Sequence, residues 1–289
     1  MARRLLIFGL GYSGAAVAQA ALAAGWQVAA TFRGSPPTWA NITPIAFSTA
    51  TPAITAATHL LSTIAPSAAG DPVLTAYAAA IRAAPDLSWI GYLSTTGVYG
   101  DRGGNWVDEA TSPAPNTDRS RYRLAAETAW KNVGEGRAVD IFRSAGIYGP
   151  GRSAFDDLRA GRARRVIQPG HAFGRIHRDD IAGAVRAAMA QNRPPGPRIL
   201  HLADAAPAEP AAVIAEAAAL LGMAPPPAIP FAEAWETMSP MARSFWAEDR
   251  KMSSGQTQAM LDYRWRYPSY REGLRAILAE ERGQSLLQQ

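Results

Sequence analysis

Residues 7–16, IFGLGYSGAA, decide the fold of this chain. The stretch contains three glycines with G-x-G-x-x-G spacing: Gly9, Gly11 and Gly14. A short apolar run of strand length, residues 4–8, precedes them, and an alanine-rich segment of helix length, residues 12–24, follows. The pattern predicts a strand, a tight turn and a helix in immediate succession.

Each glycine of this turn has a separate physical role. Gly9 permits the tight turn, Gly11 lets a pyrophosphate approach the backbone, and Gly14 lets the helix lie close to the strand. The amides and the dipole at the helix start, around Tyr12 and Ser13, then face the phosphates. The spacing therefore predicts a dinucleotide site, with a glycine-rich turn that binds no ligand as the alternative.

The residue after the second predicted strand, residues 26–32, bears on which dinucleotide binds. An NAD site normally has Asp or Glu at this position, where the carboxylate hydrogen-bonds the adenine ribose. This chain has Arg33 there, and its first carboxylate is Asp71. Because a guanidinium is a planar fork that suits a 2′-phosphate, we expect NADP in preference to NAD. In the alternative, Arg33 stacks on adenine or lies in solvent.

Segments of strand and helix length alternate along the first half of the chain. The further predicted strands are residues 57–66, 87–94 and 137–151, and the helices between them are residues 71–84 and 118–133. This alternation predicts an α/β fold, a doubly wound parallel sheet of the Rossmann type with helices on both faces. Ligands of such sheets bind beyond the carboxyl ends of the strands. Pro66, which ends one of these strands, is counted with the cofactor-binding residues.

The alternation breaks after Gly151, where proline clusters such as residues 193–198 and 224–230 mark loops. A helix over 179–191 and a strand over 198–204 still fit the sheet. We therefore predict a dinucleotide-binding domain of residues 1–151 plus about 177–204. Residues of about 152–176 and 205–289 are expected to form a smaller C-terminal lobe that caps the cofactor.

Composition excludes several classes of function. The chain has no cysteine, which excludes disulfides and thiolate metal sites, and its four histidines have no metal-ligand spacing. No apolar run has the length of a membrane span, and no lysine-rich tail indicates nucleic acid. The formal net charge of +5 is carried almost entirely by arginine and suits a small phosphate-bearing ligand. We expect a cytoplasmic bacterial protein whose apolar beginning is no secretory signal, and we leave a homodimer open.

Four further stretches carry a family resemblance. They are LSTTGVYGD (93–101), FRSAGIYGPGR (142–152), GRIHRDDIA (174–182) and YPSYREGL (267–274). With the glycine turn, they resemble the extended short-chain dehydrogenase/reductase superfamily, in its NAD-dependent epimerase/dehydratase group. The pattern is most similar to the atypical, YeeZ-like branch, and the superfamily resemblance covers most of residues 3–204.

The resemblance implies a catalytic hydroxyl at the end of the strand over 87–94, followed by a Tyr-x-x-x-Lys pair on the next helix. Thr95 fits the hydroxyl position. Family members often have Glu four residues after the lysine, and with Glu127 in that place the pair falls on Arg119 and Arg123. A guanidinium keeps its proton at neutral pH, so it can bind an anion or stabilise an oxyanion but cannot act as a base. Tyr122 is the candidate substitute.

Other candidate residues have both structural and functional interpretations. Tyr99 and Tyr148 are expected to line the cleft, and Asp179 and Asp180 are expected to cap the helix that follows them, beside His177. A basic cluster is either a solvated helix or a grip for an anionic substrate. Its members are Arg152, Arg159, Arg162, Arg164 and Arg165.

Two functions fit these patterns. The first is an NADP-dependent oxidoreductase, epimerase or dehydratase that acts on a small hydroxyl or carbonyl compound with an altered proton donor. The second is a catalytically silent NADP-binding sensor or regulatory protein. Intact cofactor features and a replaced proton-transfer pair suit both, and the strand-end hydroxyl and the capping lobe favour the enzyme.

Overall fold

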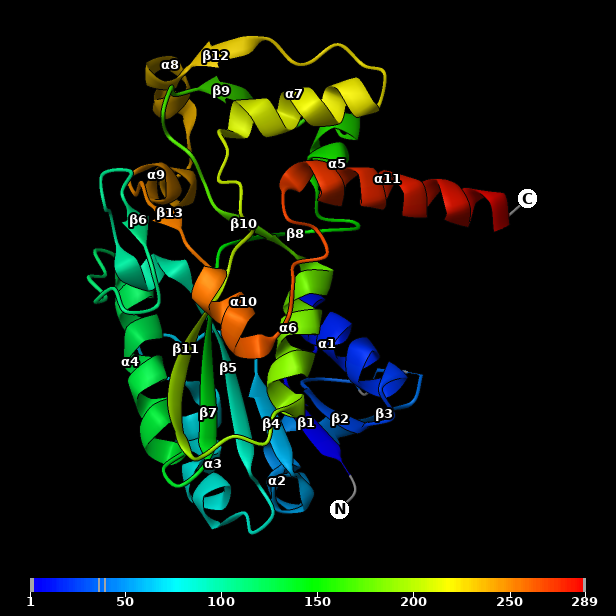
Figure 1. Ribbon diagram of the computed structural model, residues 1–289, viewed down its shortest axis with the longest axis vertical. Helices are drawn as coiled ribbons and strands as arrows, with labels where there is room; N and C mark the ends of the chain where they lie inside the picture. Colours follow the sequence, from blue (N-terminus) through cyan, green and yellow to red (C-terminus); the bar gives the residue numbers. More distant parts are fainter. Residues whose placement is uncertain (1–2, 36, 39, 288–289) are drawn as a thin grey trace.

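A seven-stranded parallel sheet forms the centre of the computed structural model, which describes residues 3–35, 37–38 and 40–287, with side chains to residue 283 (Figure 1). The strand order is β11-β7-β5-β4-β1-β2-β3. The strands are β1 Arg4–Phe8, β2 Gln27–Phe32, β3 Ile42–Ala46, β4 His59–Ser62, β5 Trp89–Thr95, β7 Ala138–Ser144 and β11 Gly196–Leu202. The predicted doubly wound Rossmann-type sheet is confirmed.

Helices cover both faces of this sheet because its strands are apolar on both sides. Leu5 and Ile7 of β1 pack with α1 (Tyr12–Ala23) and α6 (Arg178–Ala190). Leu6 and Phe8 point the other way, into a core shared with α2 (Thr51–Ala56), α3 (Pro72–Ala83) and α4 (Asp118–Val133). Figure 1 shows α3 and α4 on one side of the sheet and α1 and α6 on the other. Burial of both faces is typical of a parallel sheet.

The rest of the chain lies mainly beyond the carboxyl ends of the strands (Figure 1). It contains three short parallel strand pairs: β6 (Trp106–Val107) with β13 (Lys251–Met252), β8 (Gly146–Tyr148) with β10 (Arg175–His177), and β9 (Arg165–Ile167) with β12 (Ala228–Pro230). Its helices are α5 Ala154–Arg159, α7 Pro210–Leu220, α8 Phe231–Thr237, α9 Pro240–Trp246, α10 Gly255–Leu261 and α11 Tyr270–Leu287. Two 3₁₀ turns, η1 (Phe47–Thr49) and η2 (Thr96–Tyr99), follow β3 and β5.

The helices of this upper part pack into different apolar cores. Side chains of α5, α7 and α11, among them Phe155, Val213 and Leu274, form a core of their own. By contrast, Leu261 and Trp265, at and just after the end of α10, belong to the same core as α1 and α6. Residues 255–265 therefore pack on the sheet although they lie in the range predicted for the lobe. None of the described helices is both long enough and apolar enough to cross a bilayer.

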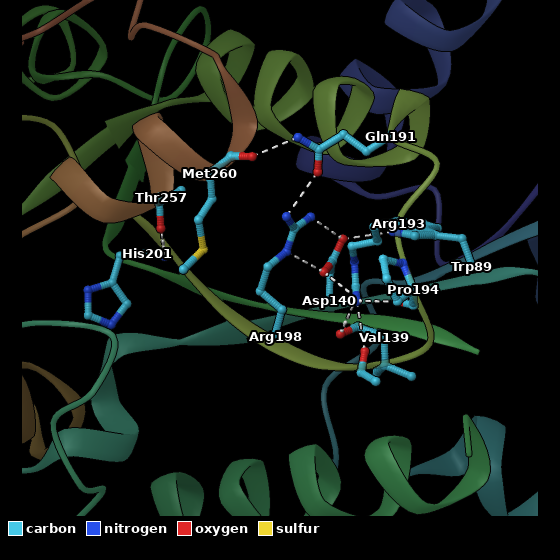
Figure 2. A network of polar contacts seen from close by, with 11 residues as sticks. Trp89, Val139, Asp140, Gln191, Arg193, Pro194, Arg198, His201, Thr257 and Met260 are labelled. Atoms are coloured by element: carbon cyan, nitrogen blue, oxygen red, sulfur yellow. Dashed lines mark hydrogen bonds and ion pairs between the residues drawn. The ribbon is translucent and has the colours of Figure 1, made fainter. Parts of the chain in front are cut away.

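A buried ion-pair network fixes the connection between α6 and β11. Asp140 of β7 is fully buried, and its carboxylate accepts a hydrogen bond from the Trp89 indole at 2.8 Å. Arg193 and Arg198 approach the same carboxylate, at 2.8 and 2.9 Å (Figure 2). Arg198 also donates to the Gln191 side chain, and with Arg193 it binds the loop before the edge strand β11 to the neighbouring strand β7. The network lies away from the carboxyl ends of the strands.

Candidate functional site

A cleft of about 600 Å³ lies at the carboxyl ends of the central strands. The glycine turn, the ends of β5 and β7 and the start of α4 form its lower walls. Residues 244–252, which run from α9 to β13, contribute to the opposite wall. The cleft thus lies where ligands of open parallel sheets bind.

The glycine turn has the geometry that its spacing predicts. Gly9 has a φ of +92°, which favours glycine, and a Cβ on Gly14 would lie 2.4 Å from the Gly9 carbonyl oxygen. Gly11 differs, because its φ is −77° and a Cβ there would meet nothing within 4 Å. Among the described residues, no side chain caps α1 at Gly11. The first amides of α1 therefore border an open cradle, and this cradle fits a pyrophosphate.

Tyr12 connects the glycine turn to the loop after β8. Its hydroxyl donates to the Pro150 carbonyl at 3.0 Å, and the guanidinium groups of Arg152 and Arg178 lie over its ring. Burial raises the pKa of Tyr12, so the phenol keeps its proton at neutral pH. The sequence pattern places Tyr12 in the turn but gives no signal for this contact across 138 residues.

The other cofactor-side candidates lie outside the wall of the cleft. Arg33 is exposed directly after β2, with its guanidinium 5.0 Å from the centre of the Phe47 ring. Pro66 is half-buried in the loop that follows β4. Tyr12, Ser13 and the glycines Gly11 and Gly14 do line the cleft, whereas Gly9 shapes the turn from behind.

The start of α4 brings three of the predicted catalytic candidates together. Thr95, Arg119 and Arg123 line the cleft, and Tyr122, half-buried on the same helix, does not. The Thr95 hydroxyl accepts a hydrogen bond from the Gly97 amide at 3.2 Å. Arg123 donates to the Leu93 carbonyl at 3.0 Å, so its guanidinium is fixed to the end of β5. The exposed Arg119 extends into the cleft wall without such an anchor among the described residues.

A buried polar network supports this wall from behind. The Ser94 hydroxyl donates to Glu127 at 2.6 Å, and Arg143 pairs with the same carboxylate at 2.7 Å. Arg143 also donates to the Tyr99 hydroxyl at 2.7 Å, and that hydroxyl lies 2.5 Å from His201 Nε2. Tyr99 is fully buried, so its predicted place on the cleft surface is wrong. The sequence interpretation used Glu127 only to set the register and missed Arg143.

The cap of α6 differs from the prediction. The helix is capped by His177, whose Nδ1 accepts from the Asp179 amide at 3.2 Å, and not by the two aspartates. Asp180 points inward and accepts hydrogen bonds from the backbone amides of Arg266 and Tyr267, at 2.7 and 3.0 Å. A capping histidine was missed because Asp is the more common cap.

Four of the five arginines in the predicted basic cluster make ion pairs or hydrogen bonds with other residues of the chain. Arg159 pairs with Glu281 at 2.6 Å, and Arg162 pairs with Asp157 at 3.1 Å. Arg164 and Arg165 donate to Thr237 and to the Pro226 carbonyl. Arg152 is the member that reaches the cleft.

Positive charge predominates among the described residues that line the cleft. The charged residues are Arg119, Arg123, Arg152, Arg175, Arg250 and Glu248. Glu248 pairs with Arg250 at 2.5 Å, which leaves four arginines without a carboxylate partner in the cleft wall. Such a surface favours an anionic ligand.

Comparison with known proteins supports the same fold. No protein-family model matches the chain. A conserved protein of unknown function from Silicibacter pomeroyi DSS is 40% identical, with a TM-score of 0.87 over 96% of this chain and 99% of that one. The protein YeeZ of Escherichia coli K12 is 35% identical over 140 residues, so the match spans about half the length of this curated relative, 47% of each chain.

More distant structures share the fold. A putative NAD-dependent epimerase/dehydratase from Methylobacillus flagellatus has a TM-score of 0.72 at 23% identity, over 97% of this chain and 99% of that one. A human epimerase family protein with NADPH has a TM-score of 0.74 at 19% identity, over 95% and 98%. These matches confirm the resemblance that the motifs carry. The chain therefore shares the fold of these epimerase/dehydratase structures, and it is similar to YeeZ over about half of its length.

Proposed function

We propose that the chain binds a nicotinamide dinucleotide in the cleft, NADP in preference to NAD, and acts on a small anionic hydroxyl or carbonyl compound. The observation that carries the proposal is the cradle at the start of α1, where Gly11 faces open space beside uncapped amides. In this proposal residues 1–151 with about 177–204 hold the cofactor. Residues of about 152–176 and 205–289 enclose the substrate.

The binding roles follow from the placement of the residues. Gly11, Tyr12, Ser13 and Gly14 would hold the pyrophosphate, with Gly9 setting the turn. Arg33 makes no ion pair with any described residue, so its guanidinium is available to a 2′-phosphate, and Pro66 would lie on the adenine side. An exposed arginine without a carboxylate partner binds phosphate at little cost in lost contacts.

The proposed chemistry uses three side chains of the cleft. The bound nicotinamide supplies hydride transfer. The Thr95 hydroxyl is placed to hydrogen-bond a substrate oxygen, and the guanidinium groups of Arg119 and Arg123 are placed to stabilise negative charge on it. Because a guanidinium keeps its proton, the acid or base of the reaction is a hydroxyl group or water. Tyr122 lies off the cleft and has no part in this proposal.

One observation favours the second candidate, a silent NADP-binding sensor. Among the described residues that line the cleft, the single phenol is Tyr12, and its hydroxyl donates to the Pro150 carbonyl. The cleft wall holds no lysine among those residues. The usual proton-transfer pair is therefore absent from the described wall, and turnover decides between the two candidates.

The binding experiment compares three proteins by calorimetric titration with NADP and NAD: wild type, Gly11→Ala and the control Gly255→Ala. Neither glycine has an atom within 4 Å of the added Cβ, so both variants should fold as the wild type does. We expect Gly11→Ala to weaken NADP binding at least ~10-fold, since its methyl group occupies the ligand's space. Gly255→Ala should not change it. A wild type that binds neither dinucleotide at millimolar concentration rejects the proposal.

Two further variants test preference and catalysis. Arg33→Gln should reduce the preference for NADP over NAD by ~10-fold, because it removes one charge-assisted contact to phosphate. Thr95→Ala should abolish the NADPH absorbance change with any substrate that the wild type turns over. Tight NADP binding without turnover across a panel of hydroxy and keto acids would favour the sensor.

A further inference from the structure

A second cavity, of about 540 Å³, lies behind the cleft between α5, α7 and the start of α11. Two residues line both spaces, Arg152 after β8 and Arg175 of β10. These two side chains therefore border both the cleft and the second cavity.

The far walls of the second cavity are aliphatic. Val213 and Ile214 of α7 and Leu274 of α11 line it, with Pro210 at the start of α7. These side chains offer no hydrogen-bonding atoms, so a nucleobase placed against them would bury its polar edge unpaired, at a cost of roughly 1–3 kcal/mol per group. An alkyl chain gains from the same surface.

Most polar groups around this cavity have hydrogen-bond or ion-pair partners within the described part of the chain. Arg162 pairs with Asp157, and Arg164 donates to Thr237. Asp156 accepts from the Ser153 amide at 2.7 Å and from its hydroxyl at 2.8 Å, which completes the cap of α5. None of these groups requires a ligand.

Arg152 and Arg175 are in no ion pair with a described residue, although the buried carboxyl of Asp204 interacts electrostatically with Arg175. Arg175 Nη1 donates to the carbonyl oxygens of Phe173 and Ala208, which are neutral acceptors, and Arg175 makes no ion pair with a described residue. Arg152 has neither a side-chain hydrogen bond nor an ion pair within the described part of the chain, and its guanidinium lies 5.7 Å from the centre of the Tyr12 ring. Two guanidinium groups that make no ion pair with a described residue, next to an apolar cavity wall, fit the head of an amphipathic anion.

We propose that the second cavity binds the aliphatic chain of a small anion whose carboxylate or phosphate head lies between Arg152 and Arg175. The head then lies at the edge of the cleft that contains Thr95. Binding of such an anion in the second cavity does not depend on the proposed function. The further statement that this anion is the substrate of the cleft rests on the proposed function. The proposed substrate is a short aliphatic acid or alkyl phosphate that carries a hydroxyl or carbonyl group.

The test measures binding of hexanoate, hexyl phosphate, acetate, hexanol and UDP to the full chain by calorimetry. We expect hexanoate or hexyl phosphate to bind at least ~10-fold more tightly than acetate or hexanol. Whichever of hexanoate and hexyl phosphate binds more tightly shows whether the site prefers a carboxylate or a phosphate head. Equal binding of hexanoate and acetate, or tighter binding of UDP than of either six-carbon anion, would overturn the proposal.

Variants locate the site. Arg152→Gln should weaken the anion at least ~10-fold, because a charge-assisted contact is lost, whereas Arg162→Gln, at a paired arginine of the same cavity, should change it less than ~2-fold. Ile214→Trp, which fills the apolar end, should remove the advantage of hexanoate over acetate. Gly11→Ala should leave hexanoate binding unchanged while it weakens NADP, so failure of the dinucleotide proposal and failure of this one are distinguishable. Equal effects of Arg152→Gln and Arg162→Gln would contradict the assignment.

Discussion

At the scale of single residues, Asp204 has the most unusual protonation near the site. Its side chain is 1% exposed, and Oδ2 has no hydrogen-bond partner among the described residues. Burial raises the pKa of Asp204 to about 7, while Arg175 acts to lower it and Asp180 to raise it. The ordinary value is near 3.8, so the folded chain holds this proton more tightly than the unfolded chain does.

The sign of the pH effect follows. The stability that Asp204 contributes is fully present below about pH 4 and is lost as the pH rises through about 7. We predict that the stability of Asp204→Asn relative to the wild type rises between about pH 4 and about pH 7, by about 1.4 kcal/mol per pH unit at most. Urea unfolding at several pH values measures this difference. Both proteins also lose stability at acid pH through His59 and His177, whose pKa values burial lowers to about 4. Subtracting one unfolding free energy from the other removes this shared loss.

The control for this titration is Asp86→Asn, at a carboxylate on the surface whose side chain is 43% exposed. Its difference from the wild type should stay flat over the same range. A flat difference for Asp204→Asn would contradict the assignment of the buried proton to Asp204.

Residue roles were predictable where one local rule decides them. The turn at Gly9 and the close approach at Gly14 were predicted from the G-x-G-x-x-G spacing, and the structure agrees, since Gly9 has a φ of +92° and a Cβ on Gly14 would lie 2.4 Å from the Gly9 carbonyl oxygen. The anchoring of Arg123 on Leu93 and of Tyr12 on Pro150 could not be predicted. Those contacts join residues 30 and 138 positions apart, and no local pattern encodes them.

At the scale of elements, the network around Asp140 joins β5, β7 and the α6–β11 loop. Removing a buried carboxylate leaves Arg193 and Arg198 buried without compensation, since their side chains are 16% and 14% exposed. We predict that Asp140→Ala lowers the free energy of unfolding by ~3–5 kcal/mol. Chemical denaturation of the wild type and of Asp140→Ala measures this loss in the free energy of unfolding. NADP affinity should not change in the folded fraction, because the network lies away from the cleft.

The matched comparison is the exposed pair of Arg4 and Asp86, whose side chains are 39% and 43% exposed. Asp86→Ala removes an ion pair of the same type and should cost less than ~1 kcal/mol. If the two variants lost equal stability, burial would not be what makes the Asp140 network important.

Element prediction succeeded for the buried strands and failed at the β3 edge of the sheet. β1 and β5 are mainly apolar runs of strand length and β7 is buried throughout, so strand-length apolar segments identify them. β3 was not predicted, because Thr43 and Pro44 are exposed in it and proline is unfavourable in a paired strand. Pro44 is tolerated because β3 pairs on one side only, with β2. The order of the strands decides that β3 lies at an edge, and this order is not a local property of the sequence.

At the scale of the whole molecule, the upper part of the chain is joined to the sheet by buried polar contacts as well as by packing. Asp180 of α6 binds the backbone that leads into α11 through the amides of Arg266 and Tyr267, and it accepts from the Tyr263 hydroxyl at 3.0 Å. Tyr148 packs edge-on against His177, the cap of the same helix. The start of α6 is therefore a common support for both parts of the molecule.

This joint predicts how the molecule opens. In Asp180→Ala two buried amides and one hydroxyl lose their acceptor, at ~1–3 kcal/mol for each group left unpaired. We expect faster hydrogen exchange in residues 263–278, with β1, β4 and β5 still protected, because the sheet core does not depend on this carboxylate. Asp179→Ala is the matched control, since Asp179 is partly exposed and pairs with Arg178 at the surface. Exchange that rises equally in the sheet and in residues 263–278 would show that Asp180 supports the whole fold and not the joint.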